Sequence, residues 1–167
     1  MHAKTKRIVI TALMTSMVCV ATMLIKIPTP LKGYMNLGDC IVLLCGWLLP
    51  CGYGFVAAGL GSALADLLSG YAIYAPATFV IKGAMAVVVF VIFKLLSKKI
   101  GKFASYIIGG IIAELIMISG YFLFEGVLYG FGASLVNIPA NAIQGAAGLV
   151  IGTALIKVLD RLKIALE

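Results

Sequence analysis

Six runs of apolar residues, four of them long enough to cross a bilayer as a helix, constrain this chain more than any other feature. A membrane-spanning helix needs roughly 20 mostly apolar residues. Glycine, proline and charged residues divide the sequence into segments close to that length. The runs cover residues 8–27, 36–49, 53–68, 76–96, 103–124 and 133–159. The sequence therefore predicts an all-α integral membrane protein with six transmembrane helices, of which the second is short.

The composition leaves little room for anything except these helices. Of the 167 residues, 63% are hydrophobic and 11% are charged, whereas soluble domains have about 25% charged residues. Six spans with their turns use almost the whole length. We therefore expect a single membrane domain over residues 1–167, without a soluble domain that carries a separate activity.

Positive charges are concentrated in three short clusters at the ends of the predicted helices. The clusters are Lys4, Lys6 and Arg7, then Lys94, Lys98, Lys99 and Lys102, and finally Lys157, Arg161 and Lys163. Cytoplasmic loops carry an excess of lysine and arginine, and six spans place all three clusters on one side. We predict a multi-pass membrane protein with both termini cytosolic. Topology accounts for the net charge of +7, so nucleic-acid binding is not indicated.

The motifs of a catalytic protein are missing from the sequence. It contains no phosphate-binding loop, no nucleophile elbow and no cluster of metal ligands. His2 is the only histidine, and the four cysteines form no C-x-x-C pair. We therefore predict that the protein is not an enzyme, and that it holds no metal and no cofactor. It is not expected to hydrolyse ATP itself.

Ionisable and amide side chains gather near one side of the predicted membrane. Each ionisable residue costs roughly 2.5–3.5 kcal/mol in a bilayer core, and such residues usually face a cavity. With the predicted topology they lie in the outer half of the bundle, as one polar stripe on each of five helices. The candidate ligand-binding residues are Asn36, Asp39, Asp66, Tyr71, Tyr74, Lys82, Glu114, Tyr121, Asn137, Asn141 and Gln144.

Spacing places two further polar residues on these stripes. Thr78 precedes Lys82 by four positions, and Glu125 follows Tyr121 by four. Glu125 is a weaker candidate because it lies near the interface. The stripes together predict an outward-facing cavity in which tyrosines stack on a flat ring. The alternative is that Asp66, Lys82 and Glu114 pair to hold the bundle while the tyrosines form an interfacial belt. The spacing leaves open whether Lys82 pairs with Asp66 or contacts a ligand.

The first helix has almost no polar group but carries a face of small residues. Ala12 and Ser16 are four positions apart, and such pairs let helix backbones approach closely. A helix without a role in the cavity is available for another partner. We predict that this face docks a second membrane protein.

Several segments resemble the substrate-binding S components of energy-coupling factor (ECF) vitamin transporters. They are Gly33-Tyr34-Met35-Asn36-Leu37-Gly38-Asp39, residues 59–67, Gly70-Tyr71, Tyr74-Ala75-Pro76, Ile81-Lys82-Gly83, residues 120–125 and residues 137–145. The similarity keeps the family order and extends over nearly the whole chain.

The resemblance implies a six-helix subunit that binds a vitamin or precursor from outside, with the first long loop as a gate. Its partners would be the transmembrane coupling protein EcfT and two ATPase subunits that use the ATP. The family's A-x-x-x-A docking motif corresponds to Ala12 and Ser16, with serine in place of the second alanine. The branch that the chain most resembles includes carriers of hydroxymethylpyrimidine and of pyridoxine. Carriers of riboflavin, queuosine and pantothenate share the architecture, so these remain alternative substrates.

Two other classes of protein fit the same apolar pattern. A secondary transporter coupled to protons through Glu114 or Asp66 would work without ATPases, but it would often show an internal repeat, and none is visible. A membrane scaffold or assembly protein would bind no small molecule.

Overall fold

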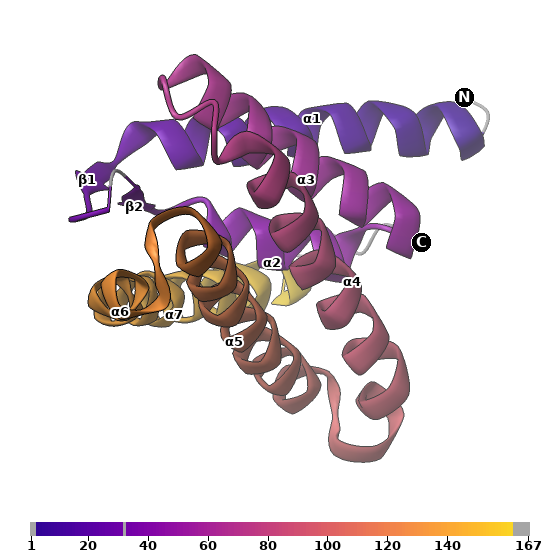
Figure 1. Ribbon diagram of the computed structural model, residues 1–167. Helices are drawn as coiled ribbons and strands as arrows, with labels where there is room; N and C mark the ends of the chain where they lie inside the picture. Colours follow the sequence, from indigo (N-terminus) through magenta and orange to yellow (C-terminus); the bar gives the residue numbers. More distant parts are fainter. Residues whose placement is uncertain (1–2, 32, 162–167) are drawn as a thin grey trace.

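Apolar helices make up most of the computed structural model, which describes residues 3–31 and 33–161 (Figure 1). The elements are α1 (Ala3–Leu24), β1 (Lys26–Pro28), β2 (Tyr34–Asn36), α2 (Asp39–Leu48), α3 (Cys51–Leu68), α4 (Ala75–Ile100), α5 (Lys102–Tyr129), α6 (Phe131–Ser134), the 3-10 turn η1 (Leu135–Asn137) and α7 (Ile138–Arg161). The prediction of a mainly helical chain with long apolar helices is confirmed.

Within the described residues, five helical segments are long and apolar enough to cross a membrane. These are Lys4–Leu24, Cys51–Leu68, Ala75–Ile100, Lys102–Tyr129 and Phe131–Arg161. The sixth apolar helix, α2, has 10 residues. At 1.5 Å per residue such a helix covers about 15 Å, roughly half of a bilayer core. A total of six spans therefore stays a prediction, and α2 is the helix on which it depends.

The short helix α2 lies in the interior of the bundle. Its residues from Asp39 to Gly46 are all buried, because α1, α3, α4 and α7 pack around it. Protein rather than lipid thus surrounds most of this helix. Leu49 and Pro50 end it, since proline at position 50 disfavours helical geometry in the residue before it.

The segment between α1 and α2 forms a small antiparallel hairpin that the sequence did not predict. Strand β1 pairs with β2 in the register Lys26–Asn36, Ile27–Met35 and Pro28–Tyr34. Proline has a fixed φ and no amide proton, so α1 cannot continue through this segment. Asn36, expected at the start of the second helix, lies instead in β2, and α2 begins at Asp39.

The hairpin marks one end of the bundle. Helices α1, α3 and α5 end there, whereas α2, α4 and α7 begin there (Figure 1). The turn between α4 and α5 lies at the opposite end, where Gly101 adopts a φ of +87°. At that end, Nζ of Lys102 lies 3.9 Å from Oδ1 of Asp160. The basic clusters on α1, α4–α5 and α7 therefore lie away from the hairpin, as the topology prediction requires; which side is cytosolic stays a prediction.

Glycines bring neighbouring helices into close contact. A Cβ atom at Gly61 of α3 would lie 2.5 Å from the carbonyl oxygen of Thr15 on α1. One at Gly148 of α7 would lie 2.7 Å from the Cβ of Asp39 on α2. Gly46 of α2 likewise faces the backbone of α4 at Ala86. These contacts hold the helices that carry the polar residues at fixed distances from one another.

Candidate functional site

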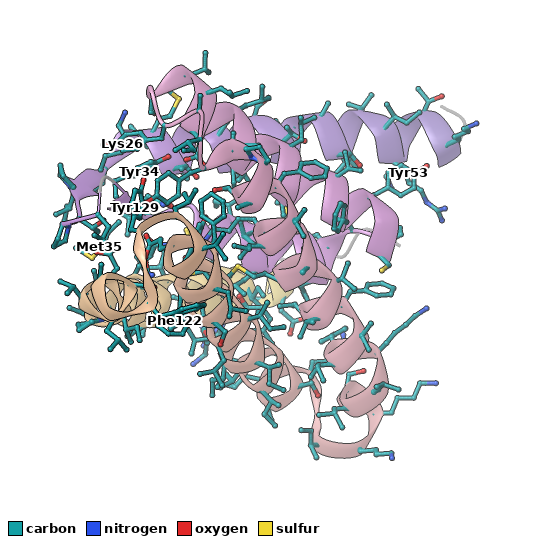
Figure 2. The ribbon with its side chains drawn as sticks, in the orientation of Figure 1. Lys26, Tyr34, Met35, Tyr53, Phe122 and Tyr129 are labelled. Carbon is teal, nitrogen blue, oxygen red and sulfur yellow. The ribbon has the colours of Figure 1, made fainter. Side chains whose placement is uncertain are left out.

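Polar side chains from the hairpin, α3, α4, α5 and α7 line a cavity at the hairpin end of the bundle. It encloses about 390 Å³ of space, including the open volume at its mouth. Figure 2 shows Lys26, Tyr34, Met35 and Tyr129 at this end and Tyr53 at the opposite end. The lining residues are Thr29, Gly33, Tyr34, Asn36, Asp66, Tyr74, Thr78, Tyr121, Glu125, Asn141 and Gln144.

The structure separates the predicted binding residues into two groups. On the cavity wall lie Asn36, Asp66, Tyr74, Tyr121, Asn141 and Gln144. The remaining candidates, which do not line it, are Asp39, Tyr71, Lys82, Glu114 and Asn137. Contact of either group with a ligand stays a prediction.

The hairpin is fastened to the helices by hydrogen bonds at the cavity. The Tyr34 hydroxyl donates to Oδ1 of Asp66 over 2.7 Å, and the backbone N–H of Asn36 donates to Oε1 of Gln144 over 2.9 Å. The Tyr74 hydroxyl donates to the carbonyl oxygen of Leu31 over 2.7 Å. Three helical regions thus hold the segment that covers the cavity.

Tyr34 is the central residue of this cover. Its ring lies 4.6 Å from the ring of Tyr71, measured between centroids, with a tilt of 48°. Burial and then the neighbouring Asp66 raise the pKa of the Tyr34 hydroxyl well above its ordinary value. The phenol therefore stays protonated at neutral pH, as a donor to Asp66 must be.

A buried ion pair lies behind the cavity wall. Lys82 of α4 pairs with Oδ1 of Asp39 of α2, and the two side chains are 2% and 0% exposed. Gln144 donates from Nε2 to the other oxygen of Asp39 over 2.7 Å. Gln144 thus contacts the hairpin through its oxygen and the ion pair through its nitrogen. Lys82 also lies over the ring of Tyr121, 5.6 Å from the centroid.

Glu114 lies in the contact between α5 and α7. A Cβ atom at Gly145 would be 2.9 Å from its Oε2, and one at Gly148 would be 3.2 Å from its Oε1. Both carboxyl oxygens are buried and make no hydrogen bond to another of the described residues. The two glycines therefore provide the space that Glu114 occupies.

Glu125 has a larger part in the site than the sequence suggested. It lines the cavity, and its Oε1 accepts a hydrogen bond from Nδ2 of Asn137 over 2.8 Å. The Tyr74 hydroxyl lies 3.3 Å from the same oxygen. Asn137 therefore contacts the cavity through Glu125 rather than directly.

Sequence reasoning left five lining residues outside the candidate set. Thr78 and Glu125 had a signal, because each lies four positions from a candidate on its own helix. Thr29, Gly33 and Tyr34 had no periodic signal, since they belong to the hairpin segment. Their place in the site follows from the way the hairpin folds over the helices.

The predicted docking face lies on the outer surface of α1. Ala12 and Ser16 are both exposed, and the Ser16 hydroxyl donates to the Ala12 carbonyl oxygen over 3.1 Å. Among residues 3–31 and 33–161, no group of three His, Cys, Asp or Glu side chains is arranged to hold a metal ion. The site thus consists of hydroxyl, amide and carboxyl groups with aromatic rings.

The helical fold and the polar cavity define a multi-pass membrane protein with a polar site at one end. The chain belongs to the family of ECF-type riboflavin transporter S components, whose family model matches residues 2–161. The predicted resemblance to ECF S components is therefore confirmed at the level of the family. Such S components are membrane proteins of transport systems and are not enzymes.

Two further comparisons found similar proteins. A protein of Pyrococcus woesei, described as an uncharacterized protein in gap 3'region, is 35% identical over 145 residues, which cover 86% of this chain and 95% of the relative. The solved structure of the S component of a bacterial ECF transporter superposes with a TM-score of 0.77 at 22% identity. That match covers 96% of this chain and 99% of the other, and it shows a shared fold. The branch of the family stays a prediction.

Proposed function

We propose that this protein is the substrate-capturing subunit of an ECF importer. The observation that carries the proposal is the cavity at the hairpin end, on which polar groups from five elements converge. Ligand sites are commonly concave, with a few polar groups that fix the ligand's orientation. The hairpin that covers this cavity supplies the first long loop that the family uses as a gate.

The proposed ligand is a small heteroaromatic vitamin or vitamin precursor. The rings of Tyr34, Tyr74 and Tyr121 border the cavity and offer flat apolar surface. Hydroxymethylpyrimidine and pyridoxine, which carry hydroxyl or amino groups on a flat ring, suit these rings and the neighbouring carboxyl and amide groups. Riboflavin, which the family name carries, is the leading alternative, and queuosine and pantothenate follow.

The proposed partners are a transmembrane coupling protein of the EcfT type and two ATPase subunits. ATP would be used by those subunits and not by this chain. The exposed small-residue face at Ala12 and Ser16 supports docking through α1. The proposal includes a single domain over residues 1–167 with six spans, both termini cytosolic, in the bacterial cytoplasmic membrane.

Calorimetric titration of the purified, detergent-solubilised protein tests the proposal. The protein is first emptied of carried-over ligand and then titrated with hydroxymethylpyrimidine, pyridoxine, riboflavin, queuosine and pantothenate. We expect one compound to bind tightly. Asn141→Ala, on the cavity wall, should weaken that binding at least about tenfold, or roughly 1.4 kcal/mol. Thr153→Ala, on the same helix outside the cavity lining, is the matched control and should bind normally.

Two outcomes would contradict the proposal in different ways. No binding across the panel by a folded sample would favour a scaffold without a ligand. Uptake into liposomes by this chain alone, driven by a proton gradient, would favour a secondary transporter.

A further inference from the structure

Two buried carboxyl groups line the same cavity. Asp66 of α3 is 4% exposed and Glu125 of α5 is 3% exposed. The chain thus places two acidic side chains from different helices on the wall of its proposed ligand site. Two acidic side chains favour ligands that carry hydrogen-bond donors and disfavour ligands that carry negative charge.

Each carboxyl group keeps one oxygen without a partner. Tyr34 donates to Oδ1 of Asp66, and Asn137 donates to Oε1 of Glu125. The second oxygens, Oδ2 of Asp66 and Oε2 of Glu125, are buried and accept no hydrogen bond from another of the described residues. Buried acceptors ordinarily have a hydrogen-bond partner. A ligand with donor groups would supply a partner for both of these oxygens.

Three donors of the cavity, by contrast, are engaged within the protein. The hydroxyl of Tyr34 donates to Asp66, and that of Tyr74 donates to the Leu31 carbonyl. The side-chain amide of Gln144 donates to Asp39. The Thr29 hydroxyl has no partner among the described residues, and the Asn141 amide also lines the cavity, so neutral donors remain and the charge of a ligand decides more than its number of acceptors.

No lysine or arginine is among the described residues that line the cavity. Lys82, the cation behind its wall, is paired with Asp39. A phosphate or carboxylate on a ligand would meet two carboxyl groups and no free cation. Recognition of such anions in proteins usually relies on arginine or lysine.

Because two carboxyl groups and no free cation line the described part of the cavity, we infer that Asp66 and Glu125 determine the charge selectivity of the site. This inference rests on the proposed function. They accept hydrogen bonds from hydroxyl groups, amino groups or a protonated ring nitrogen of a neutral or cationic ligand. They exclude forms of the same compound that carry a phosphate. The transported species is therefore the free compound and not its phosphate ester.

Matched pairs of compounds test this inference on the full-length protein in detergent. Pyridoxine, hydroxymethylpyrimidine and riboflavin are each titrated beside their phosphate monoesters and beside the acetyl ester of the same hydroxyl. Like-charge contacts disfavour binding, so we expect the free compound to bind at least about tenfold more tightly than the phosphate ester, a difference of roughly 1.4 kcal/mol. The neutral acetyl ester, which adds bulk without charge, should lose less affinity than the phosphate ester.

Two neutral variants connect the selectivity to the named residues. Asp66→Asn and Glu125→Gln keep the oxygen that accepts from Tyr34 or Asn137 and replace the unpartnered oxygen with an amide donor. In each variant we expect weaker binding of the free compound and stronger binding of the phosphate ester. Asp160→Asn is the control, because Asp160 is 54% exposed at the far end of α7.

The outcomes separate this inference from the proposed function. Equal binding of the free compound and its phosphate ester would overturn the inference and leave the capture function intact; it would mean that the carboxyl groups are protonated and donate. Equal losses with the acetyl and phosphate esters would also overturn it, because bulk and not charge would then decide. If no free compound binds, the proposed function fails and the inference fails with it. If a variant does not fold, the inference is still tested by the affinities of the unaltered protein for the free compound, its phosphate ester and its acetyl ester.

Discussion

Lys82 forms its buried ion pair with Asp39 at the start of α2, and not with Asp66 on α3. The pair joins α2 to α4 directly behind the cavity wall. Gln144 of α7 donates to the same carboxylate, so three helices meet at one charged group. This arrangement leaves Asp66 available to the hairpin and to the cavity.

Removal of the cation should destabilise the bundle. Lys82→Met leaves the carboxylate of Asp39, which is 0% exposed, without its counter-ion. Breaking a buried pair from one side costs about 3–5 kcal/mol, whereas removing both charges costs less. We expect a large loss of thermal stability in detergent, with partial recovery when Asp39→Asn is added. Lys99→Met, at an exposed position of the same helix, is the control. Equal melting of the Lys82 and Lys99 variants would contradict this role.

Close packing between α2 and α4 should make Gly46 intolerant of a side chain. A Cβ atom there would meet the carbonyl oxygen of Ala86 and the Cβ of Val89. Overpacking of this kind costs about 1–3 kcal/mol, so Gly46→Ala should lower the unfolding temperature. Gly52→Ala is the matched control, because a Cβ atom at that position meets nothing within 4 Å. A Gly46→Ala protein as stable as the control would show that the helices separate without cost.

The hydroxyl of Tyr34 should contribute to ligand capture through the hairpin. Tyr34→Phe keeps the ring but removes the hydrogen bond to Asp66. Losing a hydrogen bond to a carboxylate costs about 1.5 kcal/mol or more. Since part of that energy holds the hairpin closed, calorimetry should show a roughly tenfold weaker affinity. Tyr53→Phe, at the opposite end of the bundle (Figure 2), should bind as the unaltered protein does. Unchanged affinity for Tyr34→Phe would show that the hydrogen bond between Tyr34 and Asp66 does not contribute to ligand binding.

The small-residue face of α1 should govern assembly and not ligand binding. Ala12→Trp adds bulk at an exposed position where the proposed coupling protein approaches. We expect loss of co-purification with EcfT and the ATPases, while the calorimetric affinity of the isolated subunit is unchanged. Leu115→Trp, at a position on α5 that is 56% exposed, is the control. Intact complexes with Ala12→Trp would show that the docking face lies elsewhere.

Helical periodicity identified much of the cavity wall because it is a local property. Asp66, Tyr121, Asn141 and Gln144 lie on stripes that spacing alone revealed, and all four line the cavity. Spacing could not distinguish residues that line the cavity from residues buried between two helices. A stripe on one helix does not show how far that helix is rotated toward its neighbour. Glu114 shares the face of α5 that carries Tyr121, yet it lies against Gly145 and Gly148 of α7.

The sequence by itself determined the class of this protein. The lengths of the apolar runs, the positions of the basic clusters and the family segments are all read along the chain, and hydrophobic length alone requires a membrane environment. Only the tertiary structure decided which polar groups pair. The partner of Lys82, the hairpin over the cavity and the unpartnered oxygens of Asp66 and Glu125 depend on residues far apart in sequence. Spacing along one helix cannot specify such contacts, because they arise from the packing of several helices at once.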